Sequence, residues 1–424
     1  MTISACTAAD GAVSPQPQAP SDLTLAGRPS TVVDRPAVPT PSRATSTTMP
    51  GPDLLGSVTT PTGDPLPGVV VSLAGTAVTT DVSGGFVLSG VAPGSISAHR
   101  LGWLPASVEF DGSVPAVSIV LEPRVVRALR VSRSAAADRA VFDRILELAD
   151  LTTVNAVVFD TKDESGAVLY ETDVTEAHSI GAVSPRYDPI ELISAAKYHD
   201  LYTITRIVAF EDDYRADARS GLKLAGDWVD PTNPESWEYP LDLAVEACGF
   251  GFDEVQFDYV RFPSSSTTRV RNPETQQERT AAIAAFLSEA RDRLHPLGCA
   301  VSAAIFGIVL SARNDQGIGQ RPEDLAGIID AVSPMIYPSH YSDGWMGFES
   351  PNDHPGPVVA DALDDGAPRF GSATIMRPWL QAFYYNAAQV LAGINEAEAR
   401  GFGWILWNAT GKYDISWLPA ADGR

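Results

Sequence analysis

Hydrophobic and polar positions alternate strictly in one short stretch of the second half of the chain. In FDEVQFDYVRFP, the apolar side chains of Val255, Phe257 and Tyr259 fall on one face. Gln256 and Asp258 fall on the other face. An alternation of period two predicts a β-strand. If helices cover its apolar face, Gln256 and Asp258 point to the opposite side, where a carboxylate needs a partner.

Strand-like and helix-like segments alternate from about residue 125 to the end of the chain. The clearest helix is YDPIELISAAKYHD, in which Asp188 can cap the first turn and Pro189 suits the first helical position. The predicted strands are Val125–Val131, Val154–Asp160, Tyr202–Phe210, Glu254–Phe262, Ala300–Ile308, Ala331–Tyr337, Ala373–Phe383 and Gly401–Asn408. Eight strand-then-helix units predict an α/β fold, a (β/α)8 TIM barrel. The alternative is a doubly wound open sheet, which would normally carry a Gly-rich phosphate loop after its first strand, where this chain has RVSRSAAADR.

The pattern differs in the first 123 residues, and the difference sets the expected domains. Residues 1–50 are rich in Pro, Ser, Thr and Ala without periodicity, which predicts a disordered linker or tether. Residues 51–123 hold short β-branched runs separated by turns such as TGDP and VSGG, which predicts a small all-β sandwich. The barrel then occupies residues 124–424.

Charge narrows the range of partners. The 424 residues include 30 Lys and Arg against 53 Asp and Glu, so the formal net charge is −23. Such a surface repels phosphate backbones, so we expect no nucleic-acid partner. No uninterrupted apolar run reaches the roughly 20 residues of a membrane helix.

Three cysteines carry two further expectations. ISAC, which ends at Cys6, resembles the bacterial lipobox and makes Cys6 a possible lipid anchor, although the apolar segment of a signal does not precede it. Together with the tether-like tail, it predicts an exported, extracellular or cell-surface protein, with a cytoplasmic location as the alternative. Cys248 and Cys299 each precede a predicted strand, so they should lie at the same end of the fold, where we expect two separate thiols.

Polar and aromatic residues gather where the predicted strands end, which is where a barrel of this type carries its chemistry. Acids, amides and aromatic rings around one opening are typical of a sugar site, because rings stack on sugars and polar groups bind hydroxyls. For Asp258, the natural ion-pair partner is Arg206 or Arg261. The candidates for substrate binding are Asp163, Arg206, Gln256, Arg261, Tyr337, Arg377, Trp379, Gln381 and Trp407.

Glycoside hydrolysis normally uses two carboxyl groups that flank the bond. Asp258 is the first, and the second is open among Asp160, Asp163 and Glu211; Asp258, Asp160 and Glu211 are the catalytic candidates. The chain has six His and no H-E-x-x-H or paired Cys/His spacing, so we expect neither a metal nor a cofactor.

Several of these motifs also resemble a known family. FDEVQFDYVRFP, RPWLQAF, GWILWNA and NAVVFDTKDESG are similar to the glycoside hydrolase barrel known as domain of unknown function 4015, over roughly residues 125–415. The resemblance implies a TIM barrel and an inferred glycosidase activity. By analogy with family 13 glycosidases, Asp258 would be the nucleophile, but the general-acid glutamate that those enzymes carry on strand five has no counterpart here. The D-x-x-D-x-D-x-E pattern of chitinase-like barrels is not met either, since Gln256 and Val260 replace its second Asp and its Glu.

The preceding segment carries a resemblance of its own. GDPLPGVVV and TDVSGGF make residues 51–123 similar to the carboxypeptidase regulatory-like (transthyretin-like) domain, usually a structural module. The leading hypothesis for the whole chain is a hydrolase of extracellular or cell-envelope polysaccharide. The alternatives are a non-catalytic carbohydrate-binding surface protein with a degenerate barrel, and a purely architectural surface protein.

Overall fold

The eight parallel strands of the second half close into a barrel. The computed structural model describes residues 53–264, 273 and 275–421, so Cys6 and the predicted linker lie outside the described residues. The barrel strands are β8 (Arg127–Val131), β9 (Ala156–Lys162), β10 (Tyr202–Val208), β13 (Glu254–Asp258), β14 (Ala300–Phe306), β15 (Ala331–Ile336), β16 (Ile375–Met376) with β17 (Trp379–Gln381), and β18 (Trp404–Trp407). Each pairs in parallel with its neighbours, and the β18–β8 and β14–β15 pairings close the ring. The predicted (β/α)8 barrel is confirmed.

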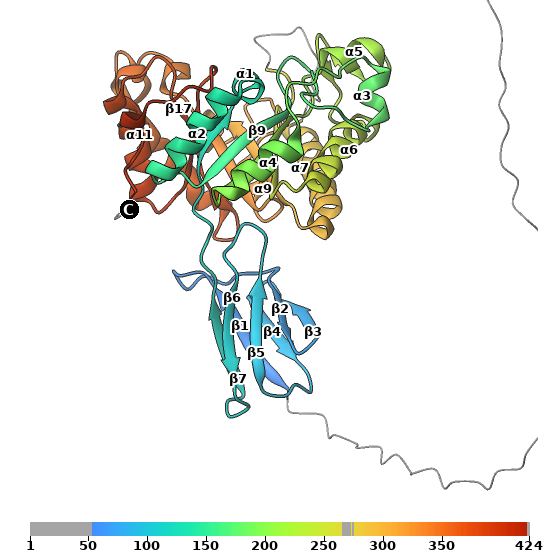
Figure 1. Ribbon diagram of the computed structural model, residues 1–424, viewed down its shortest axis with the longest axis vertical. Helices are drawn as coiled ribbons and strands as arrows, with labels where there is room; N and C mark the ends of the chain where they lie inside the picture. The colour runs from blue at the N-terminus through green and yellow to red at the C-terminus, as the bar shows by residue number, and fades with distance from the viewer. Residues whose placement is uncertain (1–52, 265–272, 274, 422–424) are drawn as a thin grey trace, which may run out of the picture. The chain divides into compact units, whose positions relative to one another are not determined.

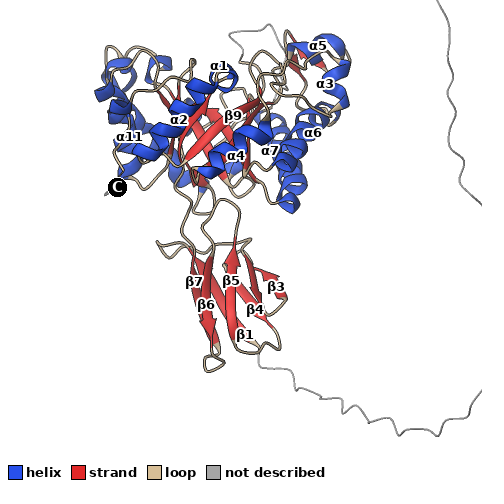
Figure 2. Cartoon of the chain, viewed as in Figure 1, coloured by secondary structure: helices blue, strands red, loops and turns tan. Residues whose placement is uncertain are grey.

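Helices surround this barrel (Figures 1 and 2). They are α1 (Arg133–Ala137), α2 (Arg139–Leu151), α3 (Thr175–Ser179), α4 (Pro189–Tyr198), α5 (Asp213–Ala218), α6 (Glu235–Phe250), α7 (Gln276–Leu294), α8 (Ile308–Ser311), α9 (Pro322–Leu325), α10 (Pro355–Gly366) and α11 (Ala387–Ala399). The predicted cap of α4 is present, because Asp188 accepts hydrogen bonds from the amides of Ile190 and Glu191, with Pro189 at the first helical position. Among the described residues, no helix is both long and apolar enough to cross a membrane.

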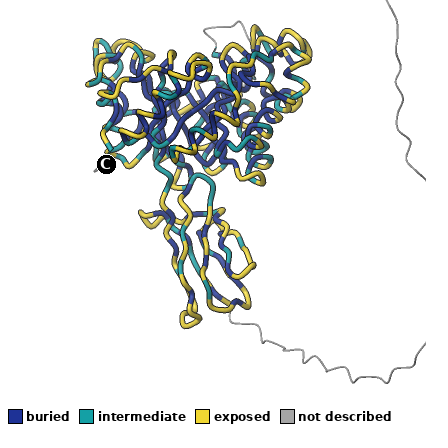
Figure 3. Tube along the Cα trace, in the orientation of Figure 1, coloured by how far each residue is buried: buried dark blue, intermediate teal, exposed yellow. Residues whose placement is uncertain are grey.

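The two faces of each barrel strand meet different surroundings, although buried residues predominate along the barrel strands as a whole (Figure 3). Val255 and Phe257 belong to the large hydrophobic cluster between strands and helices, and the ring of Phe257 meets Phe286 of α7 edge-on at 5.0 Å. A smaller cluster, which includes Val158, Ile204 and Ile405, fills the barrel interior. The predicted alternation around Asp258 therefore has its physical cause: one face packs on helices and the other faces inward.

Residues 54–120 form two small sheets. Their strands are β1 (Leu54–Thr59), β2 (Val70–Leu73), β3 (Thr76–Thr79), β4 (Gly85–Leu88), β5 (Gly94–His99), β6 (Ala106–Phe110) and β7 (Ala116–Val120). The sheet orders are β4-β1-β7 and β3-β2-β5-β6, and residues of both sheets, such as Val58 and Val71, share one hydrophobic cluster. In the VSGG turn, Gly84 has φ +72, a conformation that favours glycine. The sandwich architecture and the likeness to the carboxypeptidase regulatory-like domain stay predictions.

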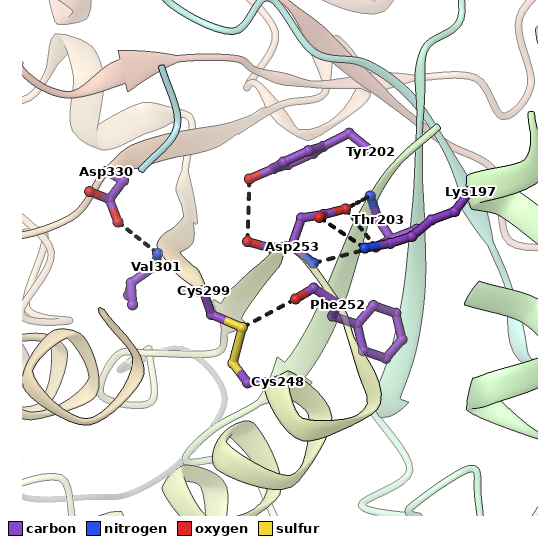
Figure 4. The surroundings of a disulfide bond; sticks show 9 residues. All are labelled: Lys197, Tyr202, Thr203, Cys248, Phe252, Asp253, Cys299, Val301 and Asp330. Atoms are coloured by element: carbon purple, nitrogen blue, oxygen red, sulfur yellow. Dashed lines mark hydrogen bonds and ion pairs between the residues drawn. A yellow bond between two sulfur atoms is a disulfide. The ribbon is translucent and has the colours of Figure 1, made fainter. Parts of the chain in front are cut away.

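Cys248 and Cys299 form a disulfide (Figure 4), so the expectation of two separate thiols is wrong. Cys248 lies near the end of α6, Cys299 lies just before β14, and their Cα atoms are 6.1 Å apart. The sequence placed both at the same end of the fold, but it could not show that a helix end and a strand start come within bridging distance. The bridge sits at the amino ends of the strands, away from the end of β13 that carries Asp258.

We expect removal of this bridge to weaken the fold without changing the chemistry at the other end of the barrel. The two cysteines are 51 residues apart, and a loop of that length corresponds to roughly 2–4 kcal/mol of stabilisation. The double variant Cys248→Ser/Cys299→Ser should show this loss in urea unfolding. An unfolding free energy of the variant equal to that of the oxidised wild type would contradict the prediction.

Candidate functional site

A cavity of about 1100 Å³ opens where the barrel strands end. It is lined by Arg206, Asp258, Tyr259, Arg261, Phe306, Gly307, Ile308, Met335, Tyr337, His340, Tyr341, Ser342, Trp345, Ala382, Phe383, Tyr384, Tyr385, Trp407, Asn408, Ala409, Thr410 and Trp417. Half of these residues are aromatic in the broad sense that includes histidine, which is the composition expected of a site for a ring-shaped ligand.

Asp258 is the last residue of β13 and reaches this cavity although it is only 3% exposed. Its Oδ2 accepts a hydrogen bond from Nε of Arg206 at 2.8 Å, and its Oδ1 accepts one from the amide of Tyr259 at 2.7 Å. Tyr259 has φ +49, an uncommon conformation for a residue with a side chain. A strained residue directly after a buried carboxylate is a feature that clusters at functional sites.

Arg206 binds three carboxylates from the inside of the barrel. Besides Asp258, its Nη1 lies 3.0 Å from Oδ1 of Asp160 and 3.1 Å from Oε2 of Glu164. Arg130 donates to the other oxygen of Asp160 at 2.6 Å, and both guanidinium groups lie over the ring of Trp407. Asp258 is therefore held at a fixed position by a network that spans the four neighbouring strands β8, β9, β10 and β13 and the last strand, β18.

The charges of this network change the pKa values of its members in opposite directions. Burial lowers the pKa of Arg206, but attraction to Asp258, Asp160 and Glu164 outweighs it and leaves that pKa well above its ordinary value. Burial raises the pKa of Glu164, but Arg206 and Arg130 outweigh it and leave that pKa below its ordinary value. Both shifts favour the charged forms of Arg206 and Glu164.

Glu211 differs from the other acids near the cavity. It follows β10, is half-buried, and forms an isolated bridge with Trp228 of β12 (Trp228–Val229), the partner of β11 (Lys223–Ala225). Burial raises the pKa of Glu211; Arg261 opposes this shift, and the negative charges of Asp227 and Asp258 add to it. A carboxyl group whose pKa is raised has the property of a proton donor.

Arg261 lies against aromatic rings at the cavity wall. Its guanidinium carbon is 4.5 Å from the ring centres of both Trp228 and Phe306, and its Nη1 donates to the carbonyl of Phe262 at 3.0 Å. Burial lowers its pKa, while the charge of Glu211 acts in the opposite direction. Arg261 thus brings a cation close to Glu211 and to the ligand space.

Five of the residues predicted for the site line the cavity, and the others do not. Those that line it are Asp258, Arg206, Arg261, Tyr337 and Trp407. Glu211 lies close enough to Asp258 and Arg261 to be influenced by their charges, as described above. The sequence analysis placed six further residues at the mouth, and the structure corrects this, because they do not line the cavity: Asp160, Asp163, Gln256, Arg377, Trp379 and Gln381.

Gln256 and Trp379 lie deeper, in the middle of the barrel. The indole nitrogen of Trp379 donates to the amide oxygen of Gln256 at 2.8 Å, and the amide nitrogen of Gln256 donates to Ser333 at 3.0 Å. The ring of Trp379 meets Trp407 edge-on at 5.3 Å, so Trp379 supports a cavity residue from below. Their polar atoms satisfy one another and form part of the packed interior.

Arg377 lies deeper still, because it forms an ion pair with Glu254, the first residue of β13. Pro378 lacks an amide donor and separates β16 from β17, so Arg377 falls in the lower half of the seventh strand. Glu254 also accepts hydrogen bonds from Ser302 and Tyr202. Arg377 would lie at the mouth only if the seventh strand ended near this residue.

Of the remaining three residues, Asp160 lies within β9, whereas Asp163 and Gln381 hold loops. Asp160 has both oxygens in ion pairs, with Arg130 and Arg206. Asp163 accepts hydrogen bonds from the amide and hydroxyl of Ser165 in the turn after β9.

Gln381 fixes the loops after the sixth and seventh strands to each other. Its amide nitrogen lies 3.2 Å from both the side chain of Asn352 and the carbonyl of Phe383, and its oxygen accepts from the amide of Ser339 at 3.2 Å.

Sequence reasoning missed most of the aromatic wall. The missed residues are Tyr259, Phe306, Tyr341, Trp345, Phe383, Tyr384, Tyr385 and Trp417. A signal was present in the segments YPSHYSDGW and AFYYN, which place six aromatic residues directly after the sixth and seventh strands. Within the part of the chain that the structure describes, no group of three or more His, Cys, Asp or Glu could hold a metal ion.

We expect Arg206 to be a main source of stability for this end of the barrel. Arg206→Met would leave Asp258 and Asp160 without a shared cation in a buried place, which costs about 3–5 kcal/mol. Urea unfolding at neutral pH measures the loss.

The matched control is Arg139→Met. Arg139 pairs with Asp143 and Glu191 at the surface, where solvent screens the charges and loss of the pairs should have little effect on stability. Equal effects of the two substitutions would show that the buried network is not needed for stability.

Comparisons with known proteins bear on this site. Residues 128–413 match domain of unknown function 4015, a family described as "Putative glycosyl hydrolase domain". No curated protein matches the chain. Among solved structures, a hypothetical protein from Ruminiclostridium thermocellum ATCC 27405 is 29% identical, over 41% of this chain and 96% of that chain, with a TM-score of 0.38.

Two further solved structures are similar at lower identity. The PgaB (BpsB) glycoside hydrolase domain from Bordetella bronchiseptica is 11% identical, over 68% of this chain and 94% of that chain, with a TM-score of 0.48. The spore cortex-lytic enzyme SleL of Bacillus megaterium QM B1551 is 14% identical, over 70% of this chain and 73% of that chain, with a TM-score of 0.45. Because the family match alone spans more than half of the residues, the chain belongs to the glycosyl hydrolase domain family known as domain of unknown function 4015.

Proposed function

We propose that the protein hydrolyses glycosidic bonds of a polysaccharide, with Asp258 as the carboxylate that acts at the sugar carbon. The observation that carries this proposal is the placement of Asp258, which Arg206 holds at the edge of a cavity with aromatic walls. Sugar rings stack on aromatic faces, and hydrolysis of the glycosidic bond needs a carboxylate beside the ring. Family membership supports the same reaction class.

The second carboxyl group of the reaction is Glu211. Its pKa is raised by burial and by the charges of Asp227 and Asp258, against the effect of Arg261, and a raised pKa suits a carboxyl group that donates a proton. Asp160 is a weaker candidate, since both of its oxygens are engaged by arginines. Asp163 accepts hydrogen bonds from Ser165 in the turn after β9, and its Oδ2 lies 3.4 Å from Nη1 of Arg133. This choice deepens the sequence analysis, which left the acid open.

The reaction then requires a proton transfer from Glu211 and a second step at Asp258. Glu211 gives its proton to the glycosidic oxygen while the bond from that oxygen to the anomeric carbon breaks. Asp258 either bonds to the anomeric carbon, and water later releases the sugar, or takes a proton from the water that attacks that carbon. The first course retains and the second inverts the anomeric configuration, so the anomer of the first product identifies the role of Asp258.

The substrate class and location complete the proposal. An extracellular or cell-envelope polysaccharide fits an exported protein, and the Cys248–Cys299 bridge supports an oxidising compartment. The lipid anchor at Cys6 remains part of this proposal and falls outside the described residues.

A specific observation favours the alternative of a binding protein without catalysis. Asp258 is the only carboxylate among the described residues that line the cavity, and β14, the fifth strand, carries no acid. If Glu211 cannot reach the glycosidic oxygen, the aromatic walls would still bind a glycan.

Asp258→Asn should lower turnover on polysaccharides and aryl glycosides by on the order of 10³-fold or more, because the amide neither attacks carbon nor accepts a proton from water. The measurement is release of reducing ends, with thermal unfolding to confirm the fold. The matched control is Asp292→Asn, on the exposed surface of α7, which should retain wild-type rates.

Turnover of Asp258→Asn near the wild-type level would refute the assignment of Asp258. Glycan binding by the wild type without any cleavage would instead favour the binding protein.

Glu211→Gln should act through the leaving group. We expect a fall of about 100-fold on substrates whose leaving alcohol needs a proton, and a smaller fall on nitrophenyl glycosides. In the wild type, kcat/KM should decrease as the pH rises through the raised pKa of Glu211, because the acid form is lost, and the variant should lack this limb.

Stability gives an independent check on Glu211. A raised pKa in the folded state means that the contribution of Glu211 to stability declines as the pH rises through that pKa. Glu211→Gln should therefore be at least as stable as the wild type at neutral pH.

The pH profile of activity gives the contradicting outcome. If kcat/KM of Glu211→Gln still decreased at high pH as it does in the wild type, another group would be the acid.

A further inference from the structure

Tyr384 is an exposed tyrosine at the rim of the cavity. It lines the cavity although 94% of its surface is exposed, and its backbone has φ +61. A left-handed backbone is uncommon for a residue with a side chain and clusters at functional sites. The two features together indicate that the ring of Tyr384 is presented to solvent for a purpose.

Aromatic rings connect Tyr384 with the interior of the site. The ring centre of Phe383 lies 5.4 Å from that of Tyr384 and 5.6 Å from that of Tyr337, each pair meeting edge-on. Tyr337 is buried, and its pKa is raised well above its ordinary value by burial and then by the charge of Asp258. We call Tyr337, Phe383 and Tyr384 the aromatic ladder; it leads from beside Asp258 to the molecular surface.

A second pair of rings borders the same cavity. Tyr341 and Trp345 meet edge-on at 5.3 Å, and Met346, 45% exposed with φ +54, follows directly. Tyr341 and Trp345 line the cavity, and Met346 lies one residue beyond them. A ligand that stopped at Asp258 would leave these surfaces uncovered.

We propose that Tyr384 is a binding platform for a sugar unit outside the cavity, so that the natural substrate is a long polysaccharide chain rather than a short oligosaccharide. The proposal rests on the proposed function and names its substrate class. The chain passes from Asp258 along the aromatic ladder and continues past Tyr384, where a ring stacks on the exposed face. The net charge of −23 repels polyanions, so the polymer is neutral or basic.

Three substitutions at Tyr384 separate the ring from the backbone. Tyr384→Ala removes the ring and keeps the strain, Tyr384→Gly removes both, and Tyr384→Phe keeps the ring. The readout is the ratio of kcat/KM on long neutral and amino-sugar polysaccharides to kcat/KM on a nitrophenyl monosaccharide. The dissociation constants of the same polymers and of their disaccharides are measured in parallel by calorimetry.

We expect the polymer-to-monosaccharide ratio and the polymer affinity to fall about tenfold in both Tyr384→Ala and Tyr384→Gly, and to stay within twofold in Tyr384→Phe. Tyr198→Ala is the control, because Tyr198 is 87% exposed at the end of α4 and belongs to no part of the site. It should leave both quantities unchanged.

Two results would overturn the platform. One is a ratio and affinity that do not change in Tyr384→Ala; the other is a loss in Tyr384→Ala that Tyr384→Gly restores, which would assign the effect to the backbone. Failure of the proposed hydrolysis has a different signature, namely no cleavage by the wild type. In that case the polymer affinities of the same variants still decide on Tyr384.

Discussion

The ion pair between Arg206 and Asp258 is the interaction on which the rest of the site depends. A carboxylate at the end of β13 is nearly as buried as the hydrophobic core, and it is stable there only because a guanidinium group from the next strand binds it. Asp160 and Arg130 extend the pair and limit how far Arg206 can move. The same contacts that stabilise the upper barrel therefore orient Asp258 toward the cavity, which is the preorganisation that catalysis needs.

Polar pairs fill the lower barrel as well, and they explain why the site has a fixed depth. Glu254 pairs with Arg377 near the amino ends of the strands, and Gln256 pairs with Trp379 above them. Nε of Arg377 is buried without a hydrogen-bond partner among the described residues, whereas Glu254, Gln256 and Trp379 bond to groups inside the barrel. The cavity begins above Trp379, at Trp407, where the rings and charges first meet open space.

Local patterns predicted the fold better than they predicted the site. The alternation gave the correct faces for Val255, Phe257 and Asp258, because strand periodicity depends only on neighbouring residues, but it placed Tyr259 on the helix side, whereas β13 ends at Asp258 and Tyr259 lines the cavity. The depth of Arg377 depends on where Pro378 interrupts the seventh strand, and the Cys248–Cys299 bridge depends on the approach of two elements far apart in sequence. Neither can be read from spacing, whereas the aromatic runs after the sixth and seventh strands could have been read as a wall of the cavity.

Two carboxyl groups with different surroundings give the strongest physical reason to regard the barrel as an enzyme rather than a binding protein. Binding alone would be served by the aromatic walls, and it gives no reason for Glu211 to lie half-buried near the charge of Asp258, where its ionised form is disfavoured. Arg261 reduces this cost but does not remove it. Under the proposed function, Asp258, which Arg206 binds, and Glu211, whose pKa burial raises, would divide the roles of base and acid, a division that has a chemical use when a bond is broken between them.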